Sequence, residues 1–336
     1  MSKLKVIQLL PELNYGGVER GTKDLSNALI SEGHKSIVIS NGGIFEKDII
    51  DNGAKHISLP IHKKSIFSLF LAKSLRRIYE DEKPDIIHVR SRIPAWINFF
   101  ACRKLLKKPI LISTFHGLYS KPIYSQIMTR VDHTIAISKT VKDYILKTYK
   151  FPENKISIIP RGCDMVYFNK NDVKPEWLKR WYKEYPQTMN KIILTLPTRI
   201  TKWKGVDNFI ELISRLDGNT FHGLIVGPTS KSKLRYLKSL KNKIRKLGIN
   251  DNVTFTGSRN DINNIYKMSD ITFNLSIQPE PFGRTTIEAI SCGSKFIGWD
   301  HGGTKEILEE LYPDGLVKLG DIDSVSYTHL TLPTRI

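Results

Sequence analysis

The sequence predicts an α/β protein made of two doubly wound domains that face each other across a cleft. Short runs of β-branched residues alternate with amphipathic stretches along the chain, and the alternation is interrupted once, over residues 168–190. Strands that alternate with helices are typical of parallel sheets covered by helices on both faces. The length of 336 residues also fits two ordinary domains.

The first series of strands is expected to form a domain over residues 1–167. Each predicted strand is followed by a helix or a turn, and the strands are Val6–Leu10, Ser36–Ser40, Ile86–Val89, Ile110–Thr114, Thr134–Ile137 and Ile156–Ile159. Residues 168–190 contain Pro175, Pro186 and many charged residues but no clear strand. We interpret this segment as the connection between the domains.

The second series is expected to form a domain over residues 191–324. Its predicted strands are Ile192–Leu196, Leu224–Val226, Val253–Thr256, Ile271–Leu275, Lys295–Gly298 and Gly315–Leu319. In a doubly wound sheet the carboxyl ends of the strands open on the ligand-binding crevice. Side chains just beyond these strands are therefore the candidates for binding and catalysis.

Composition excludes several classes of protein. A hydrophobic fraction of 40% with 25% charged residues indicates a folded globular chain. Cys102, Cys163 and Cys292 are too few and too scattered for a disulfide framework or a zinc site. No apolar run approaches the ~18 residues of a membrane span, and the first residues lack the cleavage region of a signal peptide. We therefore expect a cytoplasmic protein with reduced thiols.

The net charge of +19 predicts attraction to polyanions such as nucleic acid, anionic lipid headgroups or phosphorylated substrates. Residues 1–165 carry 27 Lys and Arg against 15 Asp and Glu, so the excess leans to the first domain. Residues 63–78 are expected to form a basic amphipathic helix and residues 103–108 the end of another, and such helices can lie on an anionic membrane. The alternative is that their apolar faces pack on the domain's own sheet.

Two candidate features follow strands of the first series. Gly16 and Gly17 come after the first strand, where paired glycines let a ligand approach the backbone and the next helix points its N–H groups at a phosphate. A plain strand-to-helix turn also favours glycine, and the GxGxxG fingerprint of dinucleotide binding is missing here. His116 follows another strand and is expected to reach the substrate, although an isolated loop histidine is also compatible with no task.

Arg199 and Lys204 follow the first strand of the second series, with a helix expected over Val206–Leu216 behind them. The two cations are placed to grip a diphosphate, and the helix N-terminus adds partial positive charge. In that role they replace a divalent metal ion, and we find no DxD triplet or other metal-ligand cluster in the sequence. The alternative of solvated cations fits Lys202 better than Arg199.

The most specific feature is the segment from Glu280 to Glu288. Its Pro-Glu-Pro-Phe-Gly run predicts a loop before a helix over residues 285–291, so the two carboxylates are separated by up to roughly 12 Å if the chain is helical. This is comparable to the span from a hexose to a ribose across a diphosphate. Glu280 is expected to bind the sugar hydroxyls and Glu288 the ribose hydroxyls, while backbone N–H groups at Phe282, Gly283 and Arg284 meet the phosphate or the sugar. The alternative is two ordinary surface carboxylates.

Taken together, these residues resemble family 4 of the retaining glycosyltransferases, which have the GT-B fold. The resemblance covers roughly residues 5–322, and its motifs occur in the family's order. They are Gly16-Gly17-Val18-Glu19, Phe115-His116-Gly117, Ile159-Pro160-Arg161-Gly162-Cys163-Asp164, Arg199 with Lys204-Gly205, Glu280 with Glu288, and residues 299–307.

The resemblance implies transfer of a hexose from a UDP- or GDP-linked sugar to an acceptor, with retention of anomeric configuration and without a metal ion or cofactor. It implies that Arg199 and Lys204 stabilise the departing diphosphate, that Glu280 holds the donor sugar and that Glu288 holds the ribose. His116 is expected near the reacting centre, and Arg259 near the nucleotide base. The implied donor-binding set is completed by Gly16, Gly17, Phe282, Gly283, Arg284 and Thr285.

Arg161 stands where many members of this family have Asn before Gly. We expect this departure to alter contacts with acceptor or phosphate without touching the residues named above. The basic first domain favours a glycan or glycolipid acceptor, of the lipid-linked or lipopolysaccharide type, made at the inner face of a bacterial membrane with peripheral contact to anionic lipid. This expectation rests on analogy with the family.

Other functions fit parts of the pattern. A retaining glycosidase needs two carboxylates about 5 Å apart and no grip on a phosphate. A nucleotide-sugar 2-epimerase with the same fold, or a truncated sugar-nucleotide-binding protein without turnover, stays open. A nucleic-acid binder is not expected, because the sequence has neither an aromatic-interleaved basic run nor a recognition-helix motif.

The end of the chain departs from the pattern. Residues 330–336 repeat residues 194–200 letter for letter, and Pro333 stands where a helix should continue. We expect residues 325–336 to be a foreign tail, and we assign no function to Arg335 within it. We also expect the helices that would cross back to the first domain to be missing.

Overall fold

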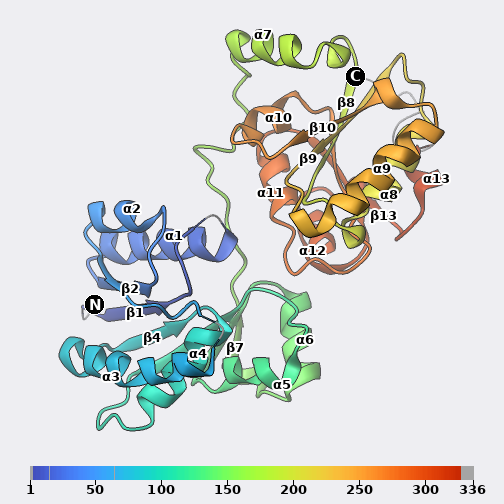
Figure 1. The fold of residues 1–336 in the computed structure, drawn as a ribbon. Helices are drawn as coiled ribbons and strands as arrows, with labels where there is room; N and C mark the ends of the chain where they lie inside the picture. Colours follow the sequence, from blue (N-terminus) through green and yellow to red (C-terminus); the bar gives the residue numbers. More distant parts are fainter. Residues whose placement is uncertain (1–2, 15, 64, 327–336) are drawn as a thin grey trace. The chain divides into compact units, whose positions relative to one another are not determined.

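The computed structural model describes residues 3–14, 16–63 and 65–326. These residues belong to two compact units, Met1–Arg161 (unit 1) and Gly162–Ile336 (unit 2). Each unit has one parallel sheet with helices packed around it (Figure 1). The predicted class, α/β with two doubly wound sheets, is confirmed.

The sheet of unit 1 has seven parallel strands in the order β3-β2-β1-β4-β5-β6-β7. Their bounds are β1 Lys5–Leu9, β2 Lys35–Ser40, β3 Lys55–Ser58, β4 Ile86–Val89, β5 Ile110–Phe115, β6 His133–Ala136 and β7 Ile156–Ile158. Six of them correspond to predicted strands. The sequence pattern does not predict β3, because this strand at the sheet edge has only four residues and none of them is fully buried.

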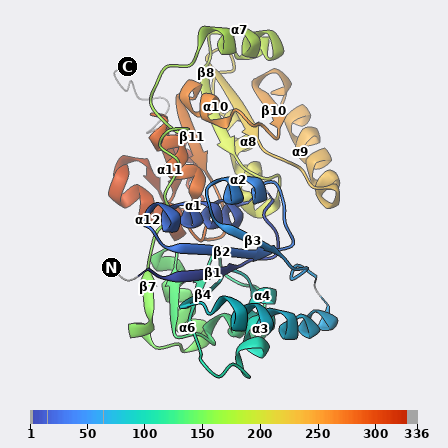
Figure 2. The same ribbon diagram turned by 90° about the vertical axis from the view of Figure 1, so that its left-hand side faces the viewer.

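The helices of unit 1 are α1 Gly17–Ser31, α2 Glu46–Asp51, α3 Leu71–Glu82, α4 Arg92–Cys102, α5 Pro122–Ser125 and α6 Lys139–Tyr149, with single 3₁₀ turns at Ile66–Phe70 (η1), Gln126–Thr129 (η2) and Glu153–Lys155 (η3). Helices α1 and α2 lie on one face of the sheet, and α3 and α4 lie on the other (Figures 1 and 2). The change of face follows from the strand order, because the chain builds outward from β1 in one direction and then from β4 in the other. A crevice is therefore expected between the carboxyl ends of β1 and β4.

The basic segment of residues 63–78 is not the single helix that we predicted. The 3₁₀ turn η1 precedes α3, and Leu75 and Tyr79 of α3 are buried in unit 1. Arg76 donates to the backbone carbonyls of Phe100 and Ala101 on α4, so α3 packs against α4. The apolar face of α3 thus packs within its own unit. Residues 103–108 follow the end of α4 and do not extend it.

The sheet of unit 2 has six parallel strands in the order β10-β9-β8-β11-β12-β13. Their bounds are β8 Ile192–Pro197, β9 Phe221–Val226, β10 Val253–Gly257, β11 Ile271–Asn274, β12 Lys295–Trp299 and β13 Leu316–Val317. All six lie where the sequence predicts strands. Here the point at which the strand order reverses is between β8 and β11.

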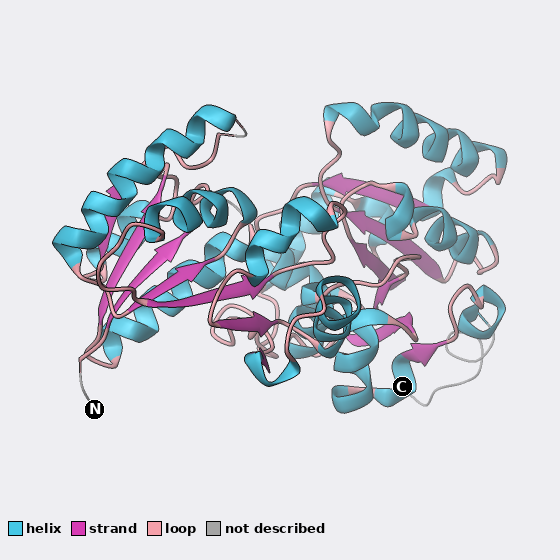
Figure 3. Ribbon diagram, turned by 90° about the horizontal axis from the view of Figure 1, so that it is seen from below, coloured by secondary structure: helices cyan, strands magenta, loops and turns pink. Residues whose placement is uncertain are grey.

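The helices of unit 2 are α7 Pro175–Glu184, α8 Val206–Ser214, α9 Leu234–Lys246, α10 Ile262–Met268, α11 Arg284–Ser291, α12 Gly302–Leu311 and α13 Ile322–Ser324, with 3₁₀ turns at Pro186–Thr188 (η4), Lys202–Lys204 (η5), Lys231–Lys233 (η6), Asn250–Asn252 (η7) and Pro313–Gly315 (η8). Neighbouring residues of β8 serve opposite faces of the sheet. Leu194 packs in one core cluster with Phe209 of α8, whereas Ile193 packs in another with Trp177 of α7. Helices lie on both faces of the sheet (Figure 3), and the alternation buries side chains on each face.

Residues 168–190, which we interpreted as the connection between the domains, contain α7. Pro175 stands in the first turn of this helix, where its missing N–H is no loss. Trp177 and Trp181, one helical turn apart, are buried against the second sheet and stack with ring centroids 5.2 Å apart. The two units divide between Arg161 and Gly162.

Most of the predicted foreign tail lies outside the described residues. Val325 is buried in the same core cluster as Val317, while residues 327–336, including Arg335, are not described. Among the described residues, no helix has the length and apolar character needed to cross a membrane.

Candidate functional site

Unit 2 has a candidate site at the carboxyl ends of three neighbouring strands, β8, β11 and β12. The loop after β8 carries Arg199 and Lys204, the loop after β11 carries Glu280, and α12 begins after β12. Because β8 and β11 adjoin at the reversal of strand order, these loops meet where doubly wound sheets bind ligands.

The first two loops are in close contact. Gly205 has a φ of 71°, and a Cβ atom there would lie 1.8 Å from the carbonyl oxygen of Leu275, so only glycine fits. The backbone N–H of Ile277 donates to the carbonyl of Trp203 at 2.8 Å. The side chain of Lys204 is thereby aimed at the loop that follows β11.

Lys204 and Glu280 form a buried ion pair. The Lys204 ammonium contacts Glu280 Oε1, and the hydroxyl of Ser276 donates to the same oxygen at 2.7 Å. The exposed fractions of the two charged side chains are only 16% and 11%. The carboxylate is therefore compensated within the protein and held in one orientation.

The start of α12 supports the backbone of Glu280. The N–H of Gly303 donates to the Glu280 carbonyl at 2.8 Å. A Cβ atom at Gly302 would lie 2.7 Å from the Glu280 nitrogen, and one at Gly303 would lie 2.5 Å from Phe282 Cα. His301 Nε2 bonds to the carbonyl of Ser276 at 2.7 Å. The His-Gly-Gly run after β12 thus fits tightly against the Glu280 loop.

Glu288 lies on α11, as predicted, and is 9% exposed. Arg284, one turn earlier, donates to its Oε1 at 2.9 Å, and the hydroxyl of Tyr266 lies 3.4 Å from its Oε2. Burial and the Glu288 carboxylate raise the pKa of Tyr266 well above its usual value, so the phenol keeps its proton. Gly283 caps the helix with a φ of 87°.

The remaining predicted residues of unit 2 differ in exposure. Phe282 and Gly283 are buried, and Thr285 is half-buried at the start of α11. The side chain of Arg199 is exposed and has no hydrogen-bond or ion-pair partner within the described part of the chain. A cation in this state can bind a phosphate without first breaking a protein contact.

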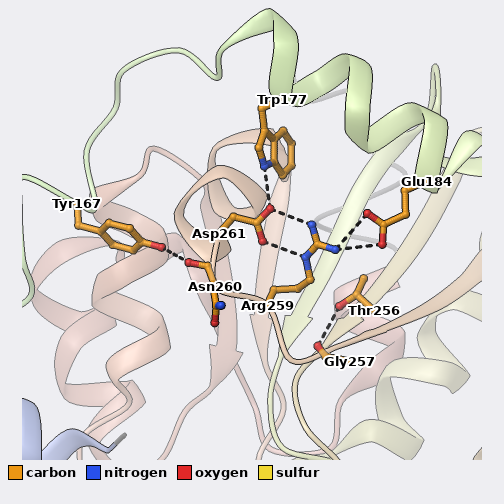
Figure 4. A network of polar contacts seen from close by, with 8 residues as sticks. All are labelled: Tyr167, Trp177, Glu184, Thr256, Gly257, Arg259, Asn260 and Asp261. Carbon is orange, nitrogen blue, oxygen red and sulfur yellow. Dashed lines mark hydrogen bonds and ion pairs between the residues drawn. The ribbon is translucent and has the colours of Figure 1, made fainter. Parts of the chain in front are cut away.

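Arg259 lies in an ion-pair network between α7 and the loop that precedes α10 (Figure 4). Its Nε and Nη2 donate to the two carboxylate oxygens of Asp261, each at 2.9 Å, and its Nη1 donates to Glu184 at 3.1 and 3.2 Å. Trp177 Nε1 also donates to Asp261, at 2.8 Å. These carboxylates raise the pKa of Arg259. Most of the hydrogen-bonding capacity of this guanidinium is therefore used within unit 2.

Unit 1 has a second cluster at the carboxyl ends of its strands. Gly16 caps α1 without a side-chain hydrogen bond, and Gly17 is the first residue of that helix. His116 directly follows β5, and Arg161 follows β7. Arg161 donates through Nη1 to the Gly17 carbonyl and through Nη2 to His116 Nδ1. Our expectation that Arg161 touches none of the predicted site residues is therefore wrong.

Positive charge surrounds the imidazole of His116. Burial, Arg90 and Arg161 hold its pKa well below the usual range. Arg90 is itself 6% exposed and donates to Gln8 Oε1 at 3.1 Å. Its own pKa is lowered to about 9 by burial and by Arg161, against the opposite effect of Asp24 and Glu19. Near neutral pH His116 is uncharged.

A pocket of about 880 Å³ opens in unit 1 beside the ends of β1, β4 and β5. Its apolar lining includes Leu69, Trp96, Ile97, Phe100 and Tyr124, and its cationic lining includes Lys63, Arg92 and Lys121. Exposed apolar side chains flank these segments, since Phe67, Phe70 and Ile123 are 73%, 78% and 90% exposed. The pocket suits a ligand with both an apolar and an anionic part.

Arg90, Ser276 and the contacts of Arg161 are not among the features that the sequence predicts. Arg90 stands directly after a predicted strand, and this position is the same signal that indicates Gly17 and His116. In residues 3–14, 16–63 and 65–326, no group of three or more His, Cys, Asp or Glu side chains is arranged to hold a metal ion.

Two family descriptions match the chain. Residues 15–166 match "Glycosyltransferase Family 4", and residues 179–326 match "Glycosyl transferases group 1". Together they cover both units.

Individual proteins give the same result. The crystal structure of a glycosyltransferase from Rickettsia africae ESF-5 is 32% identical in sequence, with a TM-score of 0.85 over 98% of this chain and 87% of that one. The UDP-Gal:alpha-D-GlcNAc-diphosphoundecaprenol alpha-1,3-galactosyltransferase of Escherichia coli is 27% identical over 354 residues, 96% of this chain and 86% of that protein. The N-acetyl-alpha-D-glucosaminyl L-malate synthase of Bacillus anthracis is 24% identical over 340 residues, again 96% and 86%.

Proposed function

The chain belongs to glycosyltransferase family 4, and from that premise we propose that it transfers a hexose from a nucleotide-diphosphate sugar to a cell-surface glycan or lipid-linked acceptor. The transfer retains anomeric configuration and uses no metal ion. The observation that carries the proposal is the buried Lys204–Glu280 pair, fixed by Ser276 and by the start of α12 at the carboxyl edge of the second sheet.

In the proposed reaction the bond between the anomeric carbon and the diphosphate oxygen breaks, a bond to an acceptor hydroxyl oxygen forms, and the proton of that hydroxyl passes to the departing diphosphate. Negative charge develops on the departing diphosphate. Lys204 and the exposed Arg199 stabilise this charge, together with the backbone N–H groups where α11 begins. Because Lys204 and these N–H groups are held in place before the reaction, little reorganisation of them opposes it.

The two carboxylates have separate tasks in this proposal. Glu280 precedes α11 and binds the hydroxyls of the hexose, while Glu288 lies inside the helix and binds the ribose. Phe282, Gly283, Arg284 and Thr285 complete the donor site. Gly16, Gly17 and His116 of unit 1 serve the same reaction.

The pocket of unit 1 supports an amphiphilic acceptor. Its aromatic lining suits an isoprenoid or acyl chain, its cations suit a phosphate, and the exposed Phe67 and Phe70 suit peripheral contact with a membrane. The name of the Escherichia coli relative also includes a diphosphoundecaprenol acceptor. The name of the Bacillus anthracis relative instead includes L-malate, so the two acceptor classes need to be compared directly.

The proposal is tested by incubating the purified chain with UDP-galactose or UDP-glucose and either an undecaprenyl-diphosphate sugar in detergent or L-malate. We expect glycosylated lipid whose new linkage keeps the α configuration, without added metal and in the presence of EDTA. Formation of glycosylated malate in place of glycosylated lipid would show that the acceptor is a small hydroxy acid. Formation of an epimerised sugar without any acceptor would contradict the proposed transferase activity.

The acceptor site has its own test in Trp96→Ala. Trp96 lines the pocket and stacks with Phe100 and Tyr124. We expect the KM for the lipid acceptor to rise about tenfold while UDP binding is unchanged. The apolar control is Leu106→Ala, because Leu106 is fully exposed and does not line the pocket. An unchanged KM for Trp96→Ala would remove the pocket from the acceptor site.

A further inference from the structure

The contact between Arg161 and His116 determines which ring nitrogen of the histidine carries the proton. Arg161 Nη2 bonds to His116 Nδ1. A guanidinium has only N–H donors and no acceptor, and it stays protonated in proteins. Nδ1 must therefore offer its lone pair, and the single proton of the neutral ring resides on Nε2.

We propose that Arg161 is a positioning residue, which holds His116 as the Nε2–H tautomer so that this nitrogen donates a hydrogen bond to an oxygen atom of the bound substrate. The inference deepens the proposed function, because it assigns the direction of the hydrogen bond at one residue of that site. It concerns Arg161, where many members of the family that the sequence resembles have asparagine.

Two contacts fix the guanidinium of Arg161. Nη1 donates to the carbonyl of Gly17 at the start of α1, while Nη2 donates to the imidazole. Arg161 follows β7 and His116 follows β5, with β6 between them in the sheet. One planar group thus joins three strand ends, so the imidazole plane and its tautomer are set by backbone geometry.

The other ring nitrogen has no hydrogen-bond partner in the part of the chain that the structure describes. His116 Nε2 is buried and makes no hydrogen bond within the described residues. A buried N–H without an acceptor is unfavourable by roughly 1–3 kcal/mol, so the site favours a ligand that supplies an oxygen atom. A sugar hydroxyl and a phosphate oxygen both meet this need.

The electrostatic surroundings agree with a neutral donor. The groups that act on the ring are Arg161, Arg90 and His88, and the first two are cationic. The acidic side chains near this cluster, Asp24 and Glu19, act on Arg90 and are not among the groups that shift His116. With Nδ1 occupied by Arg161 and Nε2 protonated, the ring has no free lone pair. His116 is therefore a hydrogen-bond donor and does not serve as a general base.

The test uses the full chain labelled with ¹⁵N-histidine, with the signals of His116 assigned by their loss in His116→Gln. In the wild type we expect an unprotonated Nδ1 and a protonated Nε2 at pH 7. In Arg161→Ala we expect a mixture of tautomers and a ring that takes up its second proton nearer pH 6.5. Arg161→Lys keeps a cationic donor and is expected to restore the wild-type tautomer in part.

Activity and folding controls accompany the spectra. We expect kcat/KM for sugar transfer to fall about tenfold in Arg161→Ala, with partial recovery in Arg161→Lys. Arg130→Ala is the matched control, because Arg130 is an exposed arginine of unit 1 with no side-chain bond among the described residues. Thermal unfolding of each variant shows whether its fold is retained. If Arg161→Ala unfolds, Arg161→Lys against the wild type carries the test alone.

Ligand additions identify the oxygen. A shift of the Nε2–H signal on addition of UDP indicates a phosphate oxygen, and a shift with UDP-glucose or UDP-galactose but not with UDP indicates a sugar hydroxyl. The proposal is overturned if Arg161→Ala keeps a single Nε2–H tautomer, or if the Nε2–H signal responds to none of these ligands. A wild type that shows the predicted tautomer and ligand shift but transfers no sugar would refute the proposed function and leave the role of Arg161 intact.

Discussion

In unit 2 the candidate site pairs each buried carboxylate with a cation, whereas in unit 1 the cluster gathers two guanidinium groups around a neutral imidazole. Lys204 compensates Glu280 and Arg284 compensates Glu288. Arg161 instead donates to a backbone carbonyl and to the ring lone pair of His116, neither of which carries a negative charge. In unit 2, removing one charge of a pair is therefore expected to lower the free energy of unfolding. In unit 1, a substitution of Arg161 is expected to change first the charge and the tautomer of His116.

The largest effect is expected from substitutions in the Lys204–Glu280 pair. Lys204→Met leaves a buried carboxylate without its cation, so we expect the free energy of unfolding to fall by about 3 kcal/mol and sugar transfer to fall about 1,000-fold. Adding Glu280→Gln to the same chain removes the unpaired charge. We expect that double variant to regain most of the stability but none of the activity, as measured by chemical denaturation and transfer rate. A double variant as unstable as Lys204→Met would contradict the pairing.

Arg199 provides the converse case in the same unit. Its exposed side chain has no partner among the described residues, so Arg199→Ala is expected to lower transfer about 100-fold and change stability by less than about 0.5 kcal/mol. Lys202→Ala, at an exposed lysine three residues away, is the control and should change neither quantity. Equal losses of activity in both variants would indicate a general effect of positive charge.

Arg259 tests whether an ion pair of unit 2 is structural or ligand-binding. Arg259→Ala removes the bonds to Asp261 and Glu184, both partly exposed, and we expect a loss of about 1–2 kcal/mol in stability. UDP affinity, measured by calorimetry at a temperature where the variant is folded, is expected to stay within twofold. A larger loss of affinity would place Arg259 at the nucleotide base, as the family resemblance implies.

The smallest expected effect is a pH dependence from buried neutral histidines. Burial lowers the pKa of His222 to about 4, and its Nε2 bonds to Thr254 Oγ1 at 2.9 Å. Below about pH 6.5 the imidazole of His222 is protonated in the unfolded chain but stays neutral in the folded chain. The free energy of unfolding therefore falls as the pH falls from 6.5 towards 4. His222→Gln should reduce the fall between pH 7.5 and 5 by about 1–2 kcal/mol in denaturation experiments. An identical fall in variant and wild type would exclude His222 as a source.

Short buried strands and the residues that follow them could be predicted from the sequence, because apolar runs and the rule for strand ends are local signals. Gly17, His116, Arg199 and Glu280 all lie after the predicted strands. The bond between Arg161 and His116 could not be predicted, since the two residues are 45 positions apart and meet only through the alignment of β5, β6 and β7.

The two errors in the helical regions have local causes. The many charged residues and the prolines of residues 168–190 do not indicate a helix, so α7 is not predicted there. The spacing of Trp177 and Trp181 nevertheless fits one face of a helix. The basic segment that includes Lys63 and Arg76 was predicted as one helix, because its apolar pattern does not distinguish a 3₁₀ turn followed by a helix from a single helix. Both cases show that packing against the unit decides the element when the local pattern is ambiguous.

In the proposed donor site Glu280 binds the hexose and Glu288 binds the ribose. Calorimetric titration of UDP and UDP-glucose into the wild type, Glu280→Gln and Glu288→Gln tests this assignment most directly. GDP and GDP-mannose serve as a second pair of ligands. In Glu280→Gln we expect nucleotide affinity to persist while the additional affinity for the nucleotide sugar is lost. In Glu288→Gln we expect the affinity for nucleotide and nucleotide sugar to fall together, about tenfold. If both variants bind both ligands as the wild type does, neither carboxylate holds the donor.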